Sequence, residues 1–390
     1  MKEQFYFQFK TKTNYGFGYS RNLPAFLAEH GFNKVVLMVH EGVAQHSDYY
    51  QEIVSLLEKS VEKLTIEILR GNEEPDYDYL DEIAKKIRAI SNIDVIVGIG
   101  GGSCLDIAKA VALLKTNPGK GLEYRGFDHG KVPGVPVIAI PTTAGSGSEA
   151  TINAVFTNKQ EKKKRGINGI NMDATYAILD AEWTLSCPFS AALSSGLDAL
   201  VHSMESFMCH QANPLTRMYS REAFRLLYFA LPCLVEDPMN RDKRQQLILA
   251  SYIAATGLFN SGSGVAGAIS YPLGVHYGLP HGLGGGMLLL DVIEFNIEKG
   301  YYEYSELCDL IEPSPGLSAE EKSRLFLDLL RKLYAKLGVE CHLDSWGITK
   351  ENVDEVAKLL HPLQAAFDQN PIPFSAKEDA LNILRGHVRS

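Results

Sequence analysis

Apolar runs of strand length alternate with helix-spaced apolar residues along the first half of the chain. Continuous apolar runs lie at 34–39, 94–99 and 135–140, and residues 64–69 alternate between apolar and polar side chains. Apolar residues at helical spacing occupy the intervening segments 55–64, 79–90 and 107–114. Runs that are apolar throughout suit strands buried on both faces. The alternation therefore predicts an α/β domain with a parallel, Rossmann-like sheet covered by helices.

The pattern changes after about residue 185, where strand-like alternation nearly disappears. Helical spacing runs through 191–211, 214–235, 243–259 and 324–337. Ser318, which precedes Ala-Glu-Glu-Lys, has the position of a helix N-cap. We therefore expect two domains, an α/β domain over residues 1–185 and an all-α domain over residues 186–390.

A glycine cluster follows the apolar run at 94–99. Gly100, Gly101, Gly102 and Ser103 lie between this expected strand and a helix expected from about Leu105. Glycines let backbone N–H groups approach a ligand, and a helix N-terminus favours phosphate. The dinucleotide fingerprint Gly-x-Gly-x-x-Gly is incomplete because Ser103 takes its third position. The cluster indicates either a phosphate-binding loop or a tight strand–helix turn.

A second loop of small and hydroxyl-bearing residues follows the run at 135–140. It extends from Ile140 to Glu149 and includes Thr142 and Thr143. Two such loops at the ends of neighbouring parallel strands would form a crevice, which is where open α/β sheets bind ligands. The pair of loops favours a nucleotide cofactor over a purely structural turn.

Acidic and histidine side chains recur at metal-ligand spacing in the second half. Asp198 and His202 are four residues apart and would share one helical face. Such a pair indicates a metal site or a surface hydrogen bond. His276 and His281 lie among glycines and prolines, where a capping or packing role is the alternative to ligation. Asp198, His202 and His281 together would offer a carboxylate and two imidazoles to one metal ion.

Composition narrows the classes of protein that remain. The chain has 390 residues, 45% of them hydrophobic, and a formal net charge of −9, which gives no global reason to bind nucleic acid or anionic lipid. No uncharged apolar run approaches the roughly 20 residues of a membrane span, and residues 1–6 lack the apolar segment of a secretory signal. The six cysteines include no Cys-x-x-Cys pair. Reduced thiols, and hence a cytoplasmic location, are expected.

These motifs, in this order and spacing, resemble those of the iron-containing (group III) alcohol dehydrogenase family, which has the dehydroquinate synthase-like fold. The landmarks are the glycine cluster with Asp106 and Lys109, and the segments 141–151, 178–180, 196–205 and 278–282. The resemblance implies NAD(P) in the first domain, one divalent ion of iron or zinc in the second, and the substrate between them. The chain resembles a divergent member of this family.

The resemblance assigns roles to individual residues. Gly102 and Ser103 would contact the pyrophosphate, and Lys164 would reach the cofactor ribose, although residues 162–165 otherwise indicate a solvated charge run. The full set of candidate cofactor-binding residues is Gly100, Gly101, Gly102, Ser103, Asp106, Thr142, Thr143, Thr151, Lys164 and His40.

One departure from the family concerns the metal. Where the family has two histidines upstream of Pro-His-Gly, this chain has Gly267 and Tyr271. Either Asp198, His202 and His281 hold the metal alone, or His276 substitutes as a ligand, or the metal is lost. We favour a retained metal. The candidate catalytic residues are His281, His276 and Tyr271, with Tyr271 either in a proton relay or filling the space of the family's histidine.

The other departure concerns the cofactor. The family commonly has an aspartate after the second strand, where its carboxylate binds the adenosine ribose and repels a 2′-phosphate. Here His40 removes that carboxylate, which admits NADP, whereas Glu41 can replace it, which favours NAD. Between NAD and NADP we favour NAD.

The resemblance implies reversible hydride transfer between a primary alcohol and the nicotinamide, with the metal as Lewis acid. The glycine-rich segments 261–267 and 284–286 suggest room for a polyol or a sugar acid such as a 3-deoxy-octulosonate. The alternatives are a lyase or cyclase of the dehydroquinate synthase type and a metal-free nucleotide-binding protein without turnover. A small alcohol or aldehyde is the expected partner, and a homodimer or larger homo-oligomer is implied.

Overall fold

The computed structural model describes residues 4–71 and 74–389. Its contacts divide these residues into two compact units. The first, which we call the sheet unit, comprises the described residues of 9–188 together with 239–252. The second, the helical unit, comprises 4–8, 189–238 and 253–389. The N-terminal expectation drawn from residues 1–6 falls partly outside the described residues.

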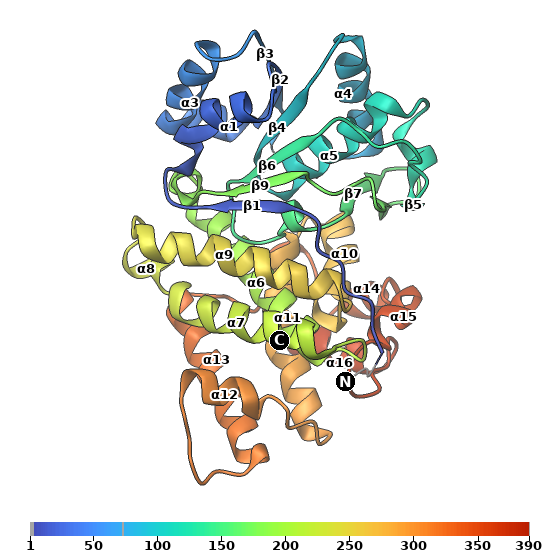
Figure 1. The fold of residues 1–390 in the computed structure, drawn as a ribbon. Helices are drawn as coiled ribbons and strands as arrows, with labels where there is room; N and C mark the ends of the chain where they lie inside the picture. Colours follow the sequence, from blue (N-terminus) through green and yellow to red (C-terminus); the bar gives the residue numbers. More distant parts are fainter. Residues whose placement is uncertain (1–3, 72–73, 390) are drawn as a thin grey trace. The chain divides into compact units, whose positions relative to one another are not determined.

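The sheet unit is built on a six-stranded sheet in which all paired strands are parallel (Figure 1). The strand order is β1-β9-β6-β4-β2-β3. The strands are β1 (Lys12–Tyr15), β2 (Lys34–His40), β3 (Lys63–Leu69), β4 (Val95–Gly100), β6 (Val137–Pro141) and β9 (Tyr176–Leu179). The predicted parallel sheet is confirmed.

Each face of this sheet carries its own apolar core. On β2, Val35, Leu37 and Val39 belong to one core, with helices α1 (Leu23–Glu29) and α3 (Asp48–Glu58). Val36 and Met38 belong to the other, with helices α4 (Tyr77–Ala89) and α5 (Gly102–Thr116). Successive strand residues point to opposite faces, so a strand between two helical layers must be apolar throughout.

The helix predicted at 55–64 is wrong in its bounds. Helix α3 runs from Asp48 to Glu58, and strand β3 already begins at Lys63. The apolar spacing continues beyond the helix because Val61 and Leu64, which follow α3 in the chain, pack against the same core as α3 does. Burial of those side chains, rather than helical structure, produced the pattern.

A smaller sheet was not predicted. Its order is β5-β8-β7, with β5 (Gly126–Phe127), β7 (Asn153–Asn158) and β8 (Lys163–Asn168). Strands β7 and β8 form an antiparallel pair. Only alternate side chains such as Ala154, Phe156 and Ile167 are buried, so the segment is too polar to be recognised as a core strand.

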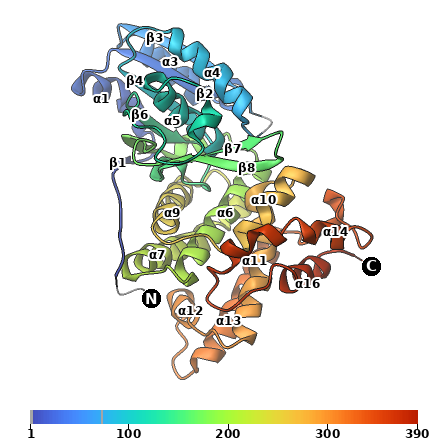
Figure 2. The same ribbon diagram turned by 90° about the vertical axis from the view of Figure 1, so that its right-hand side faces the viewer.

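The helical unit contains no strand among its described residues, which confirms the all-α expectation (Figure 2). Helix α9 (Arg241–Phe259) contributes residues to both units. The remaining helices are α6 (Phe189–Met208), α7 (Pro214–Ala230), α8 (Cys233–Glu236), α10 (Val265–Tyr277), α11 (His281–Glu298), α12 (Ser305–Ile311), α13 (Ala319–Leu337), α14 (Val353–Lys358), α15 (Gln364–Phe367) and α16 (Asp379–Gly386).

Two details of the predicted helices can be checked. The single helix expected at 214–235 is two, because Pro232 follows the end of α7 and cannot donate a backbone hydrogen bond. Ser318 is confirmed as the N-cap of α13, where it forms a capping box with Glu321. Within the described residues, no helix is long and apolar enough to cross a membrane.

Candidate functional site

The glycine cluster forms the turn from β4 into α5. Gly101 is the N-cap and α5 begins at Gly102, three residues before the predicted start. Because Gly101 has no side chain with which to cap the helix, the N-terminus of this 15-residue helix receives no side-chain cap. A Cβ added at Gly102 would lie 2.4 Å from Ser146 Oγ. The turn therefore presents backbone N–H groups beside the second loop, as a phosphate-binding turn requires.

The second loop lies next to the glycine turn at the carboxyl edge of the sheet. Gly100 and Pro141 are register partners on β4 and β6, and Thr142 N donates to Gly100 O at 3.0 Å. Thr142 is buried, whereas Thr143 and Thr151 are half-buried and Ser103 is exposed. The two loops that the sequence placed at neighbouring strand ends are thus adjacent in the structure.

A buried ion pair on α5 forms hydrogen bonds to this second loop and fixes its position. Asp106 accepts hydrogen bonds from Ser148 Oγ at 2.5 Å and Val155 N at 2.8 Å. Lys109 Nζ lies 3.6 Å from Asp106 Oδ1 and donates to the carbonyls of Ser148, at 2.8 Å, and Thr151, at 3.2 Å. Burial raises the pKa of Asp106 and lowers that of Lys109, and each partner opposes the other's shift. The pair positions the loop backbone.

Glu149 lies in the same loop without a full set of partners. Its side chain is buried, and its Oε1 has no hydrogen-bond partner among the described residues. Burial raises the pKa of Glu149 to about 7. No sequence pattern marks this residue as a candidate, because burial of a loop carboxylate has no sequence signature.

His40 and Glu41 both bind the turn that follows β3. His40 Nδ1 accepts from Gly42 N at 3.1 Å and so caps helix α2 (Glu41–His46), while its Nε2 lies 3.3 Å from Gly71 O. Glu41 Oε1 accepts from Gly71 N at 3.1 Å. His40 also lies beside the glycine turn, since a Cβ at Gly100 would be 3.2 Å from His40 Cβ.

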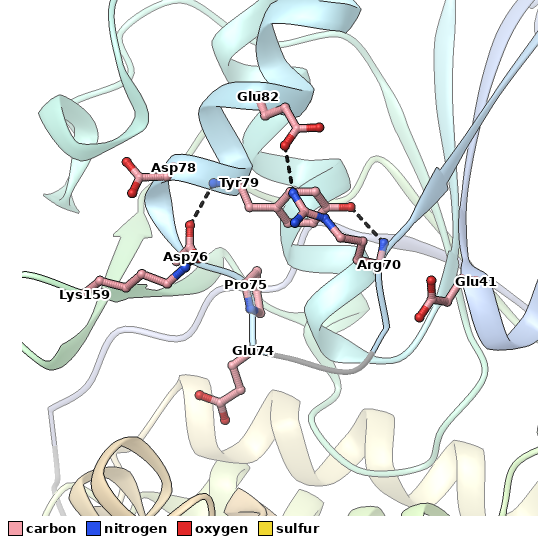
Figure 3. Close-up of a pocket in the computed structure, with 9 residues that line it drawn as sticks. All are labelled: Glu41, Arg70, Glu74, Pro75, Asp76, Asp78, Tyr79, Glu82 and Lys159. Carbon is pink, nitrogen blue, oxygen red and sulfur yellow. Dashed lines mark hydrogen bonds and ion pairs between the residues drawn. The ribbon is translucent and has the colours of Figure 1, made fainter.

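An acidic pocket opens beside Glu41 (Figure 3). Its lining includes five carboxylates and two cations, and each cation is paired with one of the carboxylates. Arg70 Nη2 lies 2.7 Å from Glu82 Oε2, with its guanidinium 4.0 Å from the Tyr79 ring centre, and Lys159 pairs with Asp76. The lining residues are Glu41, Arg70, Glu74, Pro75, Asp76, Asp78, Tyr79, Glu82 and Lys159. The pocket is therefore unfavourable for an additional phosphate.

Lys164 behaves differently from its basic neighbours. Its side chain is 7% exposed and its Nζ lies 2.5 Å from Glu74 Oε1, whereas Lys162, Lys163 and Arg165 are exposed. Lys164 thus points inward from β8 to a residue that lines the acidic pocket. The solvated-run alternative is wrong for this lysine.

In the helical unit, Asp198, His202 and His281 converge. One ligand atom from each lies within 4.8 Å of the others. Asp198 Oδ1 is 3.5 Å from His202 Nε2 and 3.8 Å from His281 Nε2. Asp198 and His202 lie in the middle of α6, and His281 is the first residue of α11.

This group fits a divalent metal. A carboxylate and two imidazoles at these distances form a common transition-metal donor set. The His202 nitrogen nearest Asp198 is Nε2, whereas its Nδ1 is buried and has no hydrogen-bond partner in the described part of the chain. His276 is exposed near the end of α10 and lies outside the group. The Tyr271 ring lies 4.5 Å from the His281 ring, centre to centre.

Glu205 is a neighbouring carboxylate that sequence analysis did not single out. It is 1% exposed, and its two oxygens accept from Gly264 N at 2.7 Å and Gly267 N at 2.8 Å. Burial raises the pKa of Glu205, and these two donors oppose the shift. Its spacing of three residues from His202 and seven from Asp198 places it on the same helical face, which is the signal that could have found it.

Ser270 connects α10 to His281. Its fully buried hydroxyl lies 2.7 Å from Gly267 O and 2.5 Å from His281 Nδ1. Nothing in the sequence marks this serine, because its imidazole partner lies eleven residues later on another helix.

The glycines of α11 do not leave the open space expected from the sequence. A Cβ at Gly282 would lie 2.1 Å from Ser194 O, one at Gly284 3.0 Å from Leu279 Cδ2, and one at Gly286 2.8 Å from Leu197 Cβ. These glycines allow close packing around α11, including its approach to α6. The inference of a roomy cavity from residues 284–286 is therefore wrong.

In comparisons with known proteins, most of the chain matches one family. Residues 10–181 match the family model described as iron-containing alcohol dehydrogenase. Residues 192–388 match the model described as the C-terminal part of the Fe-containing alcohol dehydrogenase family. The two matches cover both units that hold the candidate residues.

Individual relatives agree with the family match. The chain is 31% identical to an NAD-dependent methanol dehydrogenase of Bacillus methanolicus, over 68% of this chain and 70% of that protein. It is 30% identical to a lactaldehyde reductase of Escherichia coli K12, over 71% and 72%. The fold matches a sulfoacetaldehyde reductase from Bifidobacterium kashiwanohense in complex with NAD+, with a TM-score of 0.87, 23% identity and full coverage of both chains.

Proposed function

The chain belongs to the iron-containing alcohol dehydrogenase family and is an oxidoreductase, and we propose that it interconverts a primary alcohol and its aldehyde with NAD and one divalent metal ion. Relatives with named activities are alcohol dehydrogenases and aldehyde reductases, among them an NAD-dependent methanol dehydrogenase. Residues 1–185 are the proposed cofactor domain and residues 186–390 the proposed metal and substrate domain.

The group formed by Asp198, His202 and His281 carries this proposal. A cation that accepts electron pairs from all three would hold them together, and three protein ligands leave coordination positions for a substrate oxygen. When bound, the cation supplies Lewis acidity toward the substrate oxygen and the nicotinamide supplies hydride transfer. We assign iron to the site on the family's description, with zinc as the alternative that metal analysis will distinguish.

The chain's own groups orient the reactants. The glycine turn and the Thr142–Thr151 loop offer backbone and hydroxyl donors for the cofactor pyrophosphate. Tyr271, whose ring packs on His281, and His276, exposed near the end of α10, are the side chains that we assign to proton transfer. Substituting Tyr271 with Phe should lower kcat and change its pH dependence without loss of bound metal, which kinetics and metal analysis together would check.

The acidic pocket supports NAD over NADP. The imidazole of His40 is bound to backbone atoms, while Glu41 faces a pocket rich in carboxylates, where a 2′-phosphate would be repelled. Titration of the purified protein with NADH and NADPH should show tighter binding of NADH. Glu41→Gln should narrow the difference between the NADH and NADPH affinities about tenfold, or about 1.4 kcal/mol. Glu29→Gln, at the exposed end of α1 and outside the pocket, should leave that difference unchanged.

The substrate class is proposed at the level of a small primary alcohol or aldehyde. A polyol or a sugar acid such as a 3-deoxy-octulosonate is included in the test as a second substrate class, although residues 284–286 serve packing rather than leaving space for it. The experiment is metal analysis of the purified protein combined with a screen of alcohols, diols, sugar acids and aldehydes with NAD(H) and NADP(H). Net cofactor reduction by an alcohol, with about one ion per chain, is expected.

The same screen tests the other two candidate functions. A dehydroquinate synthase-like lyase would regenerate its NAD and show no net reduction. A metal-free nucleotide-binding protein would bind NADH without turnover on any substrate and would contain no stoichiometric metal. Either result would overturn the proposed function.

A cytoplasmic location and self-association complete the proposal. All six cysteines lie in the described part of the chain and none forms a disulfide, which is typical of a reducing compartment. Sedimentation equilibrium should give a mass of at least twice 43.0 kDa.

A further inference from the structure

The strongest unassigned feature is the hydrogen-bond geometry around Ser270. The Ser270 hydroxyl oxygen lies 2.7 Å from the Gly267 carbonyl oxygen and 2.5 Å from His281 Nδ1. Ser270 is fully buried, so these contacts are shielded from bulk water. Heavy atoms at these separations repel one another unless a hydrogen lies between them.

Counting hydrogens identifies the tautomer of His281. Two contacts require two hydrogens, and the serine hydroxyl has only one. The Gly267 carbonyl can only accept, so the serine hydrogen serves that contact. The second hydrogen must then come from His281 Nδ1, which leaves Nε2 of the neutral ring with its lone pair.

This tautomer suits the metal group. His281 Nε2 is the nitrogen that lies 3.8 Å from Asp198 Oδ1, within the cluster formed with His202. A ring nitrogen binds a metal only through its lone pair, and ligating histidines usually donate their other N–H to a fixed acceptor. Ser270 is such an acceptor, held in place by its own bond to Gly267.

Gly267 is in turn fixed by Glu205. Its N–H donates to Glu205 Oε1 at 2.8 Å, so one peptide group receives support from a carboxylate and accepts the serine hydrogen. A Cβ at this position would lie 2.9 Å from Glu205 Oε2, closer than side-chain carbons normally approach. A glycine therefore suits this place, because its backbone participates in the network.

We propose that Ser270, anchored by the Gly267 peptide and Glu205, is a positioning residue that holds His281 in the Nδ1–H tautomer and thereby raises the affinity of the Asp198–His202–His281 group for a divalent cation. The inference rests on the proposed function for the identity of the bound group. Gly267, which stands where the family has a histidine, thus takes part through its backbone rather than through a side chain.

The tautomer can be measured in the metal-free protein. In wild-type protein with 15N-labelled histidine, at a pH well above the usual imidazole pKa of about 6.5, NMR should show His281 protonated at Nδ1. Ser270→Ala should shift His281 toward the Nε2–H form or a mixture of both. A wild-type His281 with its hydrogen on Nε2 would overturn the inference.

Affinity is measured separately with Zn2+ as a redox-inert probe in competition with a chromophoric chelator. Ser270→Ala should bind Zn2+ roughly 10- to 100-fold more weakly than wild type, and Ser270→Thr, which retains a hydroxyl, should recover most of the loss. Ser220→Ala is the matched control. Ser220 is equally buried and contacts its own helix carbonyl, Thr216 O at 2.7 Å, and another side chain, Ser206 Oγ at 2.6 Å.

The outcomes separate the two claims. Equal Zn2+ affinity of wild type and a folded Ser270→Ala variant would overturn the positioning role alone. No Zn2+ binding by wild type would overturn the metal-dependent function, and this inference with it. Thermal unfolding of each variant establishes that the comparison is made between folded proteins.

Discussion

The two candidate sites are built in opposite ways. In the sheet unit, the proposed ligand-binding groups are mostly backbone atoms of the glycine turn and the adjacent loop, and buried side chains, Asp106 and Lys109, hold that loop in place. In the helical unit, the proposed ligating groups are side chains, and backbone N–H and C=O groups of α10 hold their neighbours. A phosphate is large and takes many weak donors, whereas a metal ion needs a few directed lone pairs.

The largest expected effect separates the two sites by removing one imidazole. His202→Ala should lower kcat/KM by at least about 1,000-fold, or about 4 kcal/mol. It should also abolish stoichiometric metal binding, because only two of the three proposed ligands are left. NADH binding should persist, since the cofactor loops are untouched. Activity, metal content and NADH titration check this, with His342→Ala, an exposed histidine outside the group, as control. Full activity of His202→Ala would contradict the proposal that the helical unit holds a metal needed for turnover.

The next effect removes the buried cation of the sheet unit. Lys109→Met should cost about 3–5 kcal/mol of unfolding free energy, because Asp106 is left as a buried, unpaired carboxylate and loop carbonyls lose their donor. NADH affinity should fall while Zn2+ affinity is retained. Urea unfolding and the two ligand titrations provide the measurement. The double variant Asp106→Asn with Lys109→Met should lose less than the single one.

Glu149 gives a pH-dependent effect in the same loop. Its folded-state pKa of about 7 exceeds the usual 4.5, so the folded protein binds the proton more tightly and loses stability as pH rises from 4.5 through 7. Glu149→Gln cannot ionise and should gain roughly 3 kcal/mol of unfolding free energy relative to wild type above pH 7. The unfolding free energies of wild type and Glu149→Gln, measured across this range, should converge as pH falls toward 4.5. Parallel stability profiles for the two proteins would contradict the shift.

The smallest effect probes the backbone support in the helical unit. Gly267→Ala should cost about 1 kcal/mol of stability, because its Cβ crowds Glu205 while the added methyl favours the helix. Zn2+ affinity should fall, and NADH affinity should remain unchanged. Gly386→Ala, whose Cβ would meet no atom within 4 Å, is the control. Unchanged Zn2+ binding in Gly267→Ala would show that α10 does not position the group.

The sequence predicted β2, β3, β4 and β6 of the large sheet. Three of these, β2, β4 and β6, were recognisable because a strand between two helical layers buries both faces and is mostly apolar. It did not predict β1 and β9, which have only four residues each. It missed β7 and β8 because they bury only one face, and it missed α10 and α11 because their glycines serve packing rather than periodicity. These features depend on contacts between segments distant in sequence.

The candidate site was predictable to a similar extent. The spacing of Asp198 and His202 predicts a shared helical face, and the same spacing would have added Glu205. The grouping of His281 with these two residues was a hypothesis from residue types, because its segment has no periodic pattern that would place it. Ser270 could not be predicted, since its role exists only where α10 meets the start of α11.

The central claim is that one metal ion in the helical unit enables turnover with a cofactor bound by the sheet unit. The most direct measurement titrates metal-stripped wild-type protein with Fe2+ while cofactor reduction by a primary alcohol and NADH binding are followed together. The account predicts that NADH binds before metal is added and that turnover rises to a plateau at about one ion per chain. Full turnover in the thoroughly stripped protein would contradict it.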